Sequence, residues 1–499
     1  MKKLIFALIL CLCILFTSCA VPDSICKTHT DQDDNGMCDI CHLSVLVEVD
    51  FFGINDLHGK LPDGNNHPGV DELTTYLKNA RQGNEHVVLL SVGDMWQGMA
   101  ESNLTQGTII TDWMNELDFS AMTLGNHEFD WGEDPIKKNA ELAEFPLLAI
   151  NIYERKTNKQ VDYCQSSVMV QCGDVQIGII GAMGDCYSSI SSEQTKNIYF
   201  KTGSELTGLV KKESESLREQ GADFIVYMLH DGFGDSRSGT VSSSSLKSYY
   251  DTKLSDGYVD IVFEAHTHQR YVFKDEKGVY HIQGGGDNRG ITHAEVQINS
   301  ANGNHKVNVA EPLSNGTYVH LEDDPLITQL LDKYADIISP ATRVVGTNSR
   351  KRSGNELRQL VADLYYKTGM ERWGSEYDIA LGGGFISVRD PGYLAAGDVT
   401  YGQLQGLFPF DNQLVLCSVS GQNLKDKFFE SDHYAYYICY GSYGSSIKNK
   451  IDPNGTYYIV VDSYTSTYAP NGLTEIERYD PTVYARDLLA EYIENGGLR

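Results

Sequence analysis

The sequence predicts an α/β protein of two domains, and three observations support that prediction. The chain has 499 residues, which is too long for one hydrophobic core and suggests two or more domains. Over residues 45–320, apolar runs typical of strands alternate with longer polar or amphipathic stretches, as in layered α/β domains. Residues 321–345 contain a helical pattern that begins at Pro325, and residues 346–499 repeat the α/β alternation. We therefore expect an N-terminal domain, a linker helix and a C-terminal domain over these three ranges.

The charge of the chain limits its partners. Its 40 basic and 68 acidic side chains give a formal net charge of −28, so nucleic-acid polymers and anionic membrane surfaces repel it. A small anionic substrate is compatible with this charge only where local cations or metal ions overcome the field. We expect a small-molecule partner, no nucleic-acid polymer, and a monomer.

The first residues have the form of an export signal. Met1-Lys2-Lys3 is basic, and the apolar run over residues 4–16 is too short to span a membrane but suits a secretory signal. The sequence Phe16-Thr17-Ser18-Cys19 resembles a bacterial lipobox, with phenylalanine where leucine is usual. This resemblance implies a signal peptide over residues 1–18, lipidation of Cys19 and an extracytoplasmic protein anchored to the cell membrane. Ordinary cleavage nearby, which gives a secreted protein, is the alternative.

Residues 19–44 form a small module rich in cysteine and histidine. A Cys/His pair lies 12 positions before a Cys-x-x-Cys pair, and this spacing suits a structural zinc ion. The candidate ligands are Cys26, His29, Cys38 and Cys41. The stretch Asp31–Gly36 echoes the start of a calcium loop, but His42 stands where the closing glutamate belongs. Disulfide bonds remain the alternative to zinc. Since so short a segment cannot build a core without a staple, we expect a stalk or attachment module.

In the N-terminal domain, five apolar runs end in polar side chains. In chain order these ends are Asn55-Asp56-Leu57-His58-Gly59, Gly93-Asp94, Gly125-Asn126-His127, His230 and Glu264-Ala265-His266-Thr267-His268. Such strands fix the backbone while the following loops carry reactive groups. Carboxylate and imidazole ligands suit divalent zinc, manganese, iron or nickel. One such end is commonly a surface histidine or an Asx turn, but five in order predict a metal site. Asp94 is the natural carboxylate to bridge two metals.

The order of these motifs resembles that of the calcineurin-like metallophosphoesterases. The spellings Asn-Asp-Leu-His-Gly and Gly-Asn-His-Glu-Phe-Asp are similar to the bacterial 5′-nucleotidase branch of that group. The resemblance implies that residues 45–320 form a four-layer β-sandwich flanked by helices, which binds two divalent ions such as zinc or manganese. It implies one metal held by Asp56, His58, Asp94 and His268, and a second held by Asp94, Asn126, His230 and His266. Ala265 is a mild departure, because the family usually has glycine there.

His127 follows a metal ligand but is not itself assigned to a metal. We expect it to stabilise the phosphoryl oxygens or to protonate the leaving alkoxide, with Asp130 orienting its imidazole. The alternative for Asp130 is to cap the helix that Asp134-Pro135 opens. Two metals in such a site activate water and neutralise charge during in-line phosphoryl transfer. The sequence therefore predicts a metal-dependent phosphoric monoester hydrolase.

Residues 346–499 resemble the C-terminal domain of the 5′-nucleotidase family. The resemblance implies that this α/β domain binds the substrate through arginines on the phosphate and two aromatic rings around the base. The candidates are Arg350, Arg352, Arg389, Phe410 and Tyr464. Arg389 stands further from the glycines at 382–384 than usual. The loop over 467–472 also replaces the family's Gly-Gly-Asp-Gly, so the base preference does not carry over.

These observations predict an extracytoplasmic 5′-nucleotidase that releases phosphate from a nucleotide. The alternatives within the same chemistry are a 2′,3′-cyclic-nucleotide phosphodiesterase and a nucleotide-sugar hydrolase, because the same metals serve both. A surface protein that binds nucleotides without turnover is the alternative from another class. The complete set of metal ligands and His127 favour an enzyme.

Overall fold

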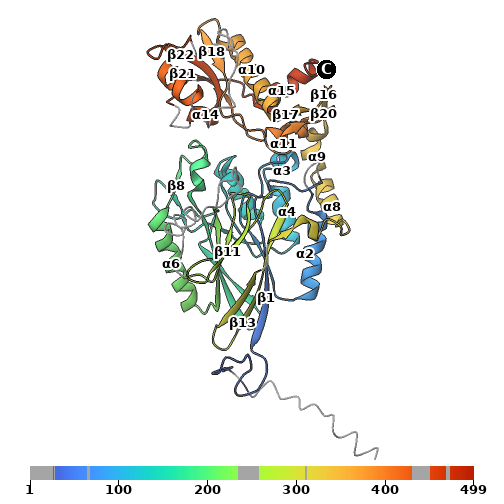
Figure 1. The fold of residues 1–499 in the computed structure, drawn as a ribbon, viewed down its shortest axis with the longest axis vertical. Coiled ribbons are helices and arrows are strands. Elements are labelled where there is room, and N and C mark those ends of the chain that lie inside the picture. The colour runs from blue at the N-terminus through green and yellow to red at the C-terminus, as the bar shows by residue number, and fades with distance from the viewer. Residues whose placement is uncertain are drawn as a thin grey trace, which may run out of the picture.

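The computed structural model describes residues 26, 28–63, 68–233, 258–309, 312–429, 450–467 and 472–499. Cys19, the expected signal peptide and most of the 467–472 loop lie outside these residues. Figure 1 shows the N-terminal domain in the middle of the molecule, the C-terminal domain above it and the Cys/His module below it. Within the described part of the chain, no helix is long and apolar enough to cross a membrane.

Two mixed sheets form the N-terminal domain. The first has the order β14 (His305–Val309), β13 (Gly290–Asn299), β1 (Leu46–Ile54), β2 (Val87–Ser91), β3 (Ala121–Thr123) and β4 (Leu147–Leu148), with β15 (Leu313–Ser314) beside β13. The second has the order β11 (Arg270–Lys274), β12 (Tyr280–Gly284), β10 (Ile261–Glu264), β9 (Phe224–His230), β7 (Val175–Met183) and β6 (Ser167–Cys172). Pairing is parallel from β1 through β4 and from β7 through β9 and β10 to β12. The loops after these strands therefore gather at one edge of each sheet.

The sheets pack face to face because β1 alternates its apolar side chains. Val49 and Phe51 point into the core between the sheets, where the Phe51 ring lies 5.8 Å from that of Phe224. Phe52 and Ile54 point to the opposite face, into the core beneath the helices. This period of two is what a strand buried on both sides requires.

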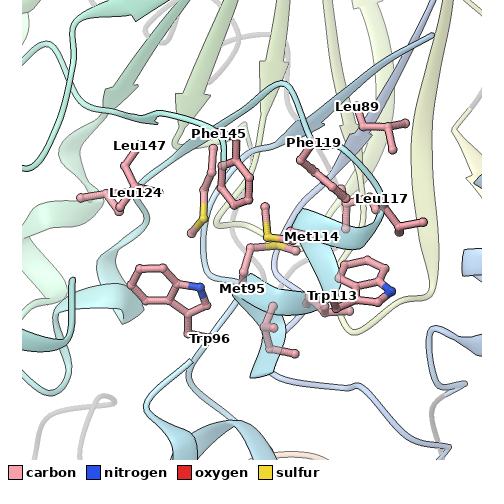
Figure 2. Packing of buried hydrophobic residues seen from close by; sticks show 14 of the residues in the cluster. Leu89, Met95, Trp96, Trp113, Met114, Leu117, Phe119, Leu124, Phe145 and Leu147 are labelled. Atoms are coloured by element: carbon pink, nitrogen blue, oxygen red, sulfur yellow. The ribbon is translucent and has the colours of Figure 1, made fainter. Parts of the chain in front are cut away.

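Helices cover the outer faces of both sheets. On the first sheet these are α2 (Asp71–Gly83), α4 (Thr108–Glu116) and α5 (Glu133–Leu142), whereas α3 (Ala100–Thr105) lies on the side of the C-terminal domain (Figure 1). Trp113 and Met114 of α4 pack there with Phe119 and Phe145 (Figure 2). On the second sheet α6 (Gly203–Glu219) buries Val210 and Leu217. The helix–sheet–sheet–helix arrangement confirms the predicted four-layer sandwich.

The linker is divided, where the sequence predicts one helix. It consists of α8 (Pro325–Lys333), α9 (Ala335–Ile338) and a final 3₁₀ turn over Ser339–Thr342. Asp324 caps α8 by accepting the N–H of Leu326 at 2.9 Å. The break falls at Tyr334, whose hydroxyl donates to the Asp112 carboxylate of α4 at 2.6 Å. This bond ties the junction to the N-terminal domain.

The C-terminal domain is a smaller α/β unit. Its main sheet has the order β18 (Ile379–Gly382), β22 (Thr456–Asp462), β21 (Leu414–Ser420) and β23 (Thr474–Arg478). The chain also forms β16 (Val344–Asn348), β17 (Arg352–Ser353), α10 (Gly354–Trp373), β19 (Tyr393–Leu394), β20 (Gly397–Thr400), α11 (Tyr401–Leu407), α14 (Ser463–Thr467) and α15 (Ala485–Glu494). A capping box between Ser353 and Glu356 starts α10, which buries Leu357 and Val361 in the domain core. The predicted α/β character of this half is confirmed.

Candidate active site

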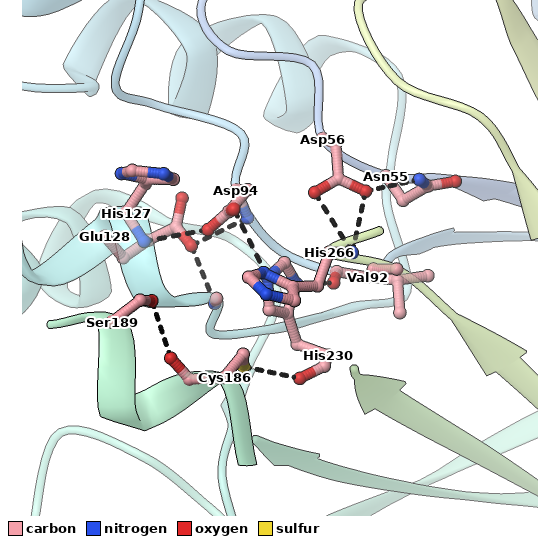
Figure 3. Close-up of polar contacts among 12 residues, drawn as sticks. Asn55, Asp56, Val92, Asp94, His127, Glu128, Cys186, Ser189, His230 and His266 are labelled. Atoms are coloured by element: carbon pink, nitrogen blue, oxygen red, sulfur yellow. Dashed lines mark hydrogen bonds and ion pairs between the residues drawn. The ribbon is translucent and has the colours of Figure 1, made fainter. Parts of the chain in front are cut away.

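The predicted metal-binding side chains meet where the carboxyl ends of the central strands gather. Two backbone bonds join the first two loops: Asp56 N–H donates to Gly93 O at 2.9 Å, and His58 N–H donates to Asp94 O at 3.0 Å. The backbone N–H of His266, after β10, reaches the Asp56 carboxylate at 3.0 Å. Segments far apart in the sequence thus form one polar cluster (Figure 3).

The loops that carry these residues have an unusual backbone. Five of the predicted ligands adopt left-handed φ angles between 50° and 68°, namely Asp56, His58, Asp94, His266 and His268. Few residues other than glycine adopt this region, and such conformations concentrate at functional sites. Gly93 also has a positive φ of 89°, and a Cβ there would lie 2.6 Å from His230 Nδ1. These loops therefore adopt unfavourable backbone conformations, and these conformations direct the side chains toward one another.

The donor atoms form two adjoining groups. In the first, His58 Nε2 lies 3.1 Å from His268 Nε2, which lies 3.4 Å from Asp56 Oδ1. In the second, His230 Nε2 lies 3.3 Å from Asp94 Oδ2. Donor atoms of Asp56, Asp94 and His230 lie within 4.8 Å of one another, so the two groups are contiguous.

The surroundings of these groups fit divalent metal ions. His58 directs Nδ1 to Gln97 O at 2.9 Å and His230 directs Nδ1 to Val92 O at 2.6 Å, which leaves each Nε2 free to bind a metal. His230 Nε2 and Asn126 Oδ1 are buried without a hydrogen-bond partner. Buried polar atoms rarely lack a hydrogen-bond partner. A metal ion bound here would satisfy both atoms, and the imidazole and carboxylate donors suit it.

Glu128 holds the metal-binding loops together, a role the sequence analysis did not assign. Its fully buried carboxylate accepts four backbone N–H bonds. Oε2 accepts from Asp94 and Gly125 at 2.8 and 2.7 Å, and Oε1 accepts from Met95 and Trp96 at 2.8 and 3.2 Å. The loop after β2 is thereby fixed to the loop after β3. The acid next to His127 in the Gly-Asn-His-Glu motif was the available signal.

His127 lies beside the cluster, paired with Asp130. His127 Nδ1 lies 2.8 Å from Asp130 Oδ2, while Gly132 occupies the N-cap of α5. The backbone N–H of His127 donates to Asp94 Oδ1 at 2.8 Å. Burial lowers the pKa of His127, but the carboxylates of Asp130 and Asp94 outweigh burial, so the pKa of His127 is raised.

The C-terminal domain closes the site with Arg389. Its Nη2 lies 3.3 Å from His127 Nε2, and its guanidinium lies 5.6 Å from the Phe410 ring centre. The adjacent Asp390 pairs with the buried Lys60 at 2.9 Å, which ties this segment to the N-terminal domain. Arg358 of α10 donates to Ile386 O at 3.2 Å and so supports the same segment from the C-terminal domain.

A cavity of about 440 Å³ opens beside His127 between the domains. Its lining includes Asn126, His266, Arg389, Phe410 and Tyr464, and so contains three of the five predicted substrate-binding side chains. The other two lie elsewhere. Arg350 is exposed and pairs with Glu356 at 2.6 Å, and Arg352 donates to Asn348 at 3.0 Å. Arg350 and Arg352 are absent from the lining of the described cavities because β17 and the start of α10 direct them to those partners.

Two further features at the metal cluster concern single residues. Ala265, where the family usually has glycine, is fully buried in the core between the sheets and lies outside the positive-φ region. Its methyl group is therefore accommodated. Cys186 places Sγ 2.9 Å from the backbone O of His230 and close to the ring nitrogens of His230 and His266. Sequence analysis gave no signal for this thiol.

Comparisons with known proteins agree with this architecture. The chain matches the calcineurin-like phosphoesterase family over residues 50–270 and the 5′-nucleotidase C-terminal domain over residues 335–439. It is 26% identical to endonuclease YhcR of Bacillus subtilis over 86% of this chain, although it spans only 38% of that protein. It is 25% identical to protein UshA of Yersinia enterocolitica over 82% of this chain and 83% of that one. A putative 5′-nucleotidase from Staphylococcus aureus shares the fold, with a TM-score of 0.68 at 20% identity over 90% of this chain and 97% of that chain.

Proposed function

The chain belongs to the 5′-nucleotidase family of calcineurin-like metallophosphoesterases, and on this premise we propose that it hydrolyses nucleotide phosphomonoesters. The observation that carries the proposal is the meeting of Arg389 and His127, 3.3 Å apart, at the border between the metal cluster and the cavity. Both side chains can donate N–H groups to one anion bound at this border, since their nitrogens lie within hydrogen-bonding distance of each other. A phosphate is the anion that an arginine fork fits.

Two divalent ions complete the site. We propose that one is held by Asp56, His58, Asp94 and His268, and the other by Asp94, Asn126, His230 and His266. When bound, the ions supply charge neutralisation for the phosphoryl oxygens and make water acidic enough to ionise near neutral pH. Glu128 positions Asp94 through its backbone, so that a single carboxylate can serve both groups.

His127 and Asp130 take part in proton transfer to the leaving group and in stabilising the charge on the phosphoryl oxygens. Asp130 fixes the imidazole through Nδ1, so Nε2 is the atom that faces Arg389 and the substrate. A protonated Nε2 donates to a phosphoryl oxygen or delivers its proton to the departing alkoxide. Arg389 binds the other phosphoryl oxygens and shares their charge as it develops.

The aromatic rings of the cavity favour a nucleotide over a simple phosphate ester. Phe410 lies 5.8 Å from the His127 ring and Tyr464 lies 5.6 Å from the Phe385 ring, all along the same cavity. A base contacts such rings through its face, which every base has, so recognition tolerates different bases. A 5′-nucleotide therefore fits with its phosphate at Arg389 and its base at the rings.

The test is inorganic phosphate release from AMP by protein loaded with manganese or zinc, with and without a chelator. We expect metal-dependent release, which His127→Ala reduces by about 10²- to 10⁴-fold while the metal content stays unchanged. Arg389→Ala should raise KM, whereas the matched control Arg350→Ala should not. Turnover of a 2′,3′-cyclic nucleotide or a nucleotide sugar, with no turnover of AMP, would identify the substrate as a phosphodiester. Cleavage of an oligonucleotide would contradict the expectation from the −28 charge, and binding of AMP without any turnover would identify a binding protein.

We further propose an extracytoplasmic, lipid-anchored protein on the basis of the export signal and Cys19. In a bacterial host, the wild-type chain should fractionate with membranes and Cys19→Ser should not. A wild-type chain found wholly in the soluble extracytoplasmic fraction would support the secreted alternative.

A further inference from the structure

The Cys/His module brings four donor atoms together. Cys26 Sγ lies 3.6 Å from Cys38 Sγ, and Cys41 Sγ lies 3.5 Å from His29 Nδ1. The donor atoms of all four residues lie within 4.8 Å of one another. The described cysteines, these three included, carry free thiols.

These two separations match two edges of a zinc tetrahedron. With zinc–sulfur bonds of about 2.3 Å and zinc–nitrogen bonds of about 2.1 Å, tetrahedral angles place two sulfurs about 3.8 Å apart and a sulfur and a nitrogen about 3.6 Å apart. The observed 3.6 and 3.5 Å match both values. A disulfide needs its two sulfurs about 2.05 Å apart. The cluster is therefore shaped to surround an ion.

The backbone supports this arrangement without a hydrophobic core. The N–H of His42 donates to Cys38 O at 2.9 Å, and the N–H of Cys38 donates to Leu43 O at 2.8 Å, which closes the turn that carries two of the thiols. The large apolar side chains of this turn, Met37, Ile40 and Leu43, are 42%, 55% and 50% exposed. They bury little apolar surface, so the segment lacks the stability that a hydrophobic core provides. It therefore needs a cross-link, such as a bound metal ion or a disulfide.

The first carboxylate of the acidic stretch in this module is used for hydrogen bonds within the protein. Both oxygens of the buried Asp31 are occupied: Oδ1 accepts the N–H of Asn35 at 3.0 Å, and Oδ2 accepts from Gly36 N–H and Asn299 Nδ2 at 2.8 and 2.7 Å. A calcium loop would turn this first carboxylate toward the ion. The Asp31–Asn299 bond instead joins the module to the end of β13.

The module lies far from the catalytic cluster. It precedes the first residue of β1 and contacts the last residue of β13, whereas the predicted ligands follow the last residue of β1 (Figure 1). The two groups also differ in chemistry: three thiolates are soft donors that select zinc, whereas the catalytic cluster offers carboxylates and imidazoles.

We propose that Cys26, His29, Cys38 and Cys41 bind one structural zinc ion. The ion holds this module in a rigid fold next to the N-terminal domain. Binding free energy of a structural zinc is folding free energy for a segment this small. The site is independent of the proposed catalytic metals, so the loss of either leaves the other in place.

The first test uses the full chain with the catalytic ligands Asp56→Asn and Asp94→Asn substituted, so that the remaining zinc reports on the module. We expect one zinc per chain, with X-ray absorption showing three sulfur neighbours at about 2.3 Å and one nitrogen. Absence of zinc, or zinc with only nitrogen and oxygen neighbours, would overturn the proposal. The measurement needs no change within the module itself.

The second test compares Cys38→Ser and Cys41→Ser with the matched control Cys172→Ala, which removes a buried thiol outside the module. Cobalt(II) added to wild-type chain and to the control should give a thiolate-to-cobalt charge-transfer band, and the two module variants should lack it. They should also lose one zinc per chain and retain phosphate release from AMP. An oxidised wild type whose mass rises by two hydrogens on reduction, with no cobalt band, would show a disulfide in place of zinc.

Discussion

The substitution Glu128→Gln tests whether one buried carboxylate assembles the metal site. Each Glu128 oxygen accepts two backbone N–H groups, from Met95 and Trp96 on one side and from Asp94 and Gly125 on the other. Glutamine keeps the shape of the side chain but replaces one oxygen with an NH₂ group. Two backbone donors then face another donor inside a fully buried pocket.

The size of the effect follows from the bonds that are lost. A hydrogen bond to a charged group contributes about 1.5–3 kcal/mol, so losing two costs about 3–6 kcal/mol before relaxation. If the loops relax, Asp94 moves and the metal site loosens. Substitutions of residues that support metal ligands weaken binding by about 10- to 100-fold. We expect metal affinity to fall in this range and Tm to fall by at least about 5 °C.

The assay compares Glu128→Gln with Glu141→Gln, which makes the same chemical change on an exposed helix position. Metal content, metal titration and thermal unfolding are measured for both, with and without added manganese. Added metal should recover part of the lost Tm in Glu128→Gln, because ligand binding stabilises the folded state. A Glu128→Gln protein with wild-type metal affinity and Tm would refute the reasoning, since two buried donors would then have been left unpaired without consequence.

Three further predictions test other parts of the molecule. Phe410→Ala should lower kcat/KM for AMP by roughly 5- to 150-fold, from about 1–3 kcal/mol of lost stacking, but should change p-nitrophenyl phosphate hydrolysis much less; equal losses would place the ring outside base recognition. Burial raises the pKa of Asp462 to about 6, although the Thr465 N–H bond opposes it. Its ionisation therefore costs the fold up to about 3 kcal/mol above pH 6 and nothing below about pH 4, where the unfolded carboxyl is also protonated. Asp462→Asn should accordingly raise the urea midpoint at pH 8 but not at pH 4, and an equal effect at both would contradict this. Removal of metal with a chelator should abolish phosphate release, and manganese should restore it; full activity without metal would exclude the proposed chemistry.

Sequence reasoning reached furthest where a strand ends directly in a candidate metal ligand. Asp56 and Asp94 follow β1 and β2, which pair in parallel, so their loops share one edge of the first sheet. His230 ends β9 of the second sheet. The four-layer sandwich was implied by the resemblance to the family, and the alternation of β1 between two cores agrees with it.

Sequence reasoning is weaker where the place of a side chain depends on its hydrogen-bond partners. Arg350 and Arg352 were chosen by their distance from family motifs, and in the structure they pair with Glu356 and Asn348, outside the lining of the cavity beside His127. Glu128 was overlooked because the acid of the Gly-Asn-His-Glu motif does not by itself reveal that it accepts backbone N–H groups from two loops. The linker helix was predicted as continuous because the Tyr334–Asp112 bond that accompanies its break joins residues more than 200 positions apart.

The site is assembled from two domains, and this has a consequence for specificity. The N-terminal domain supplies the candidate donor atoms for metals together with His127 and Asp130, which under the proposed mechanism would act on any phosphoryl group. Arg389, Phe410 and Tyr464 come from the C-terminal domain, and Lys60 bridges Asp287 and Asp390 across the boundary. Breaking that bridge with Lys60→Met should therefore weaken nucleotide selection more than metal binding. A Lys60→Met protein with an unchanged KM for AMP would show that the domains are held by other contacts, and metal loss in that variant would show that Lys60 supports the cluster itself.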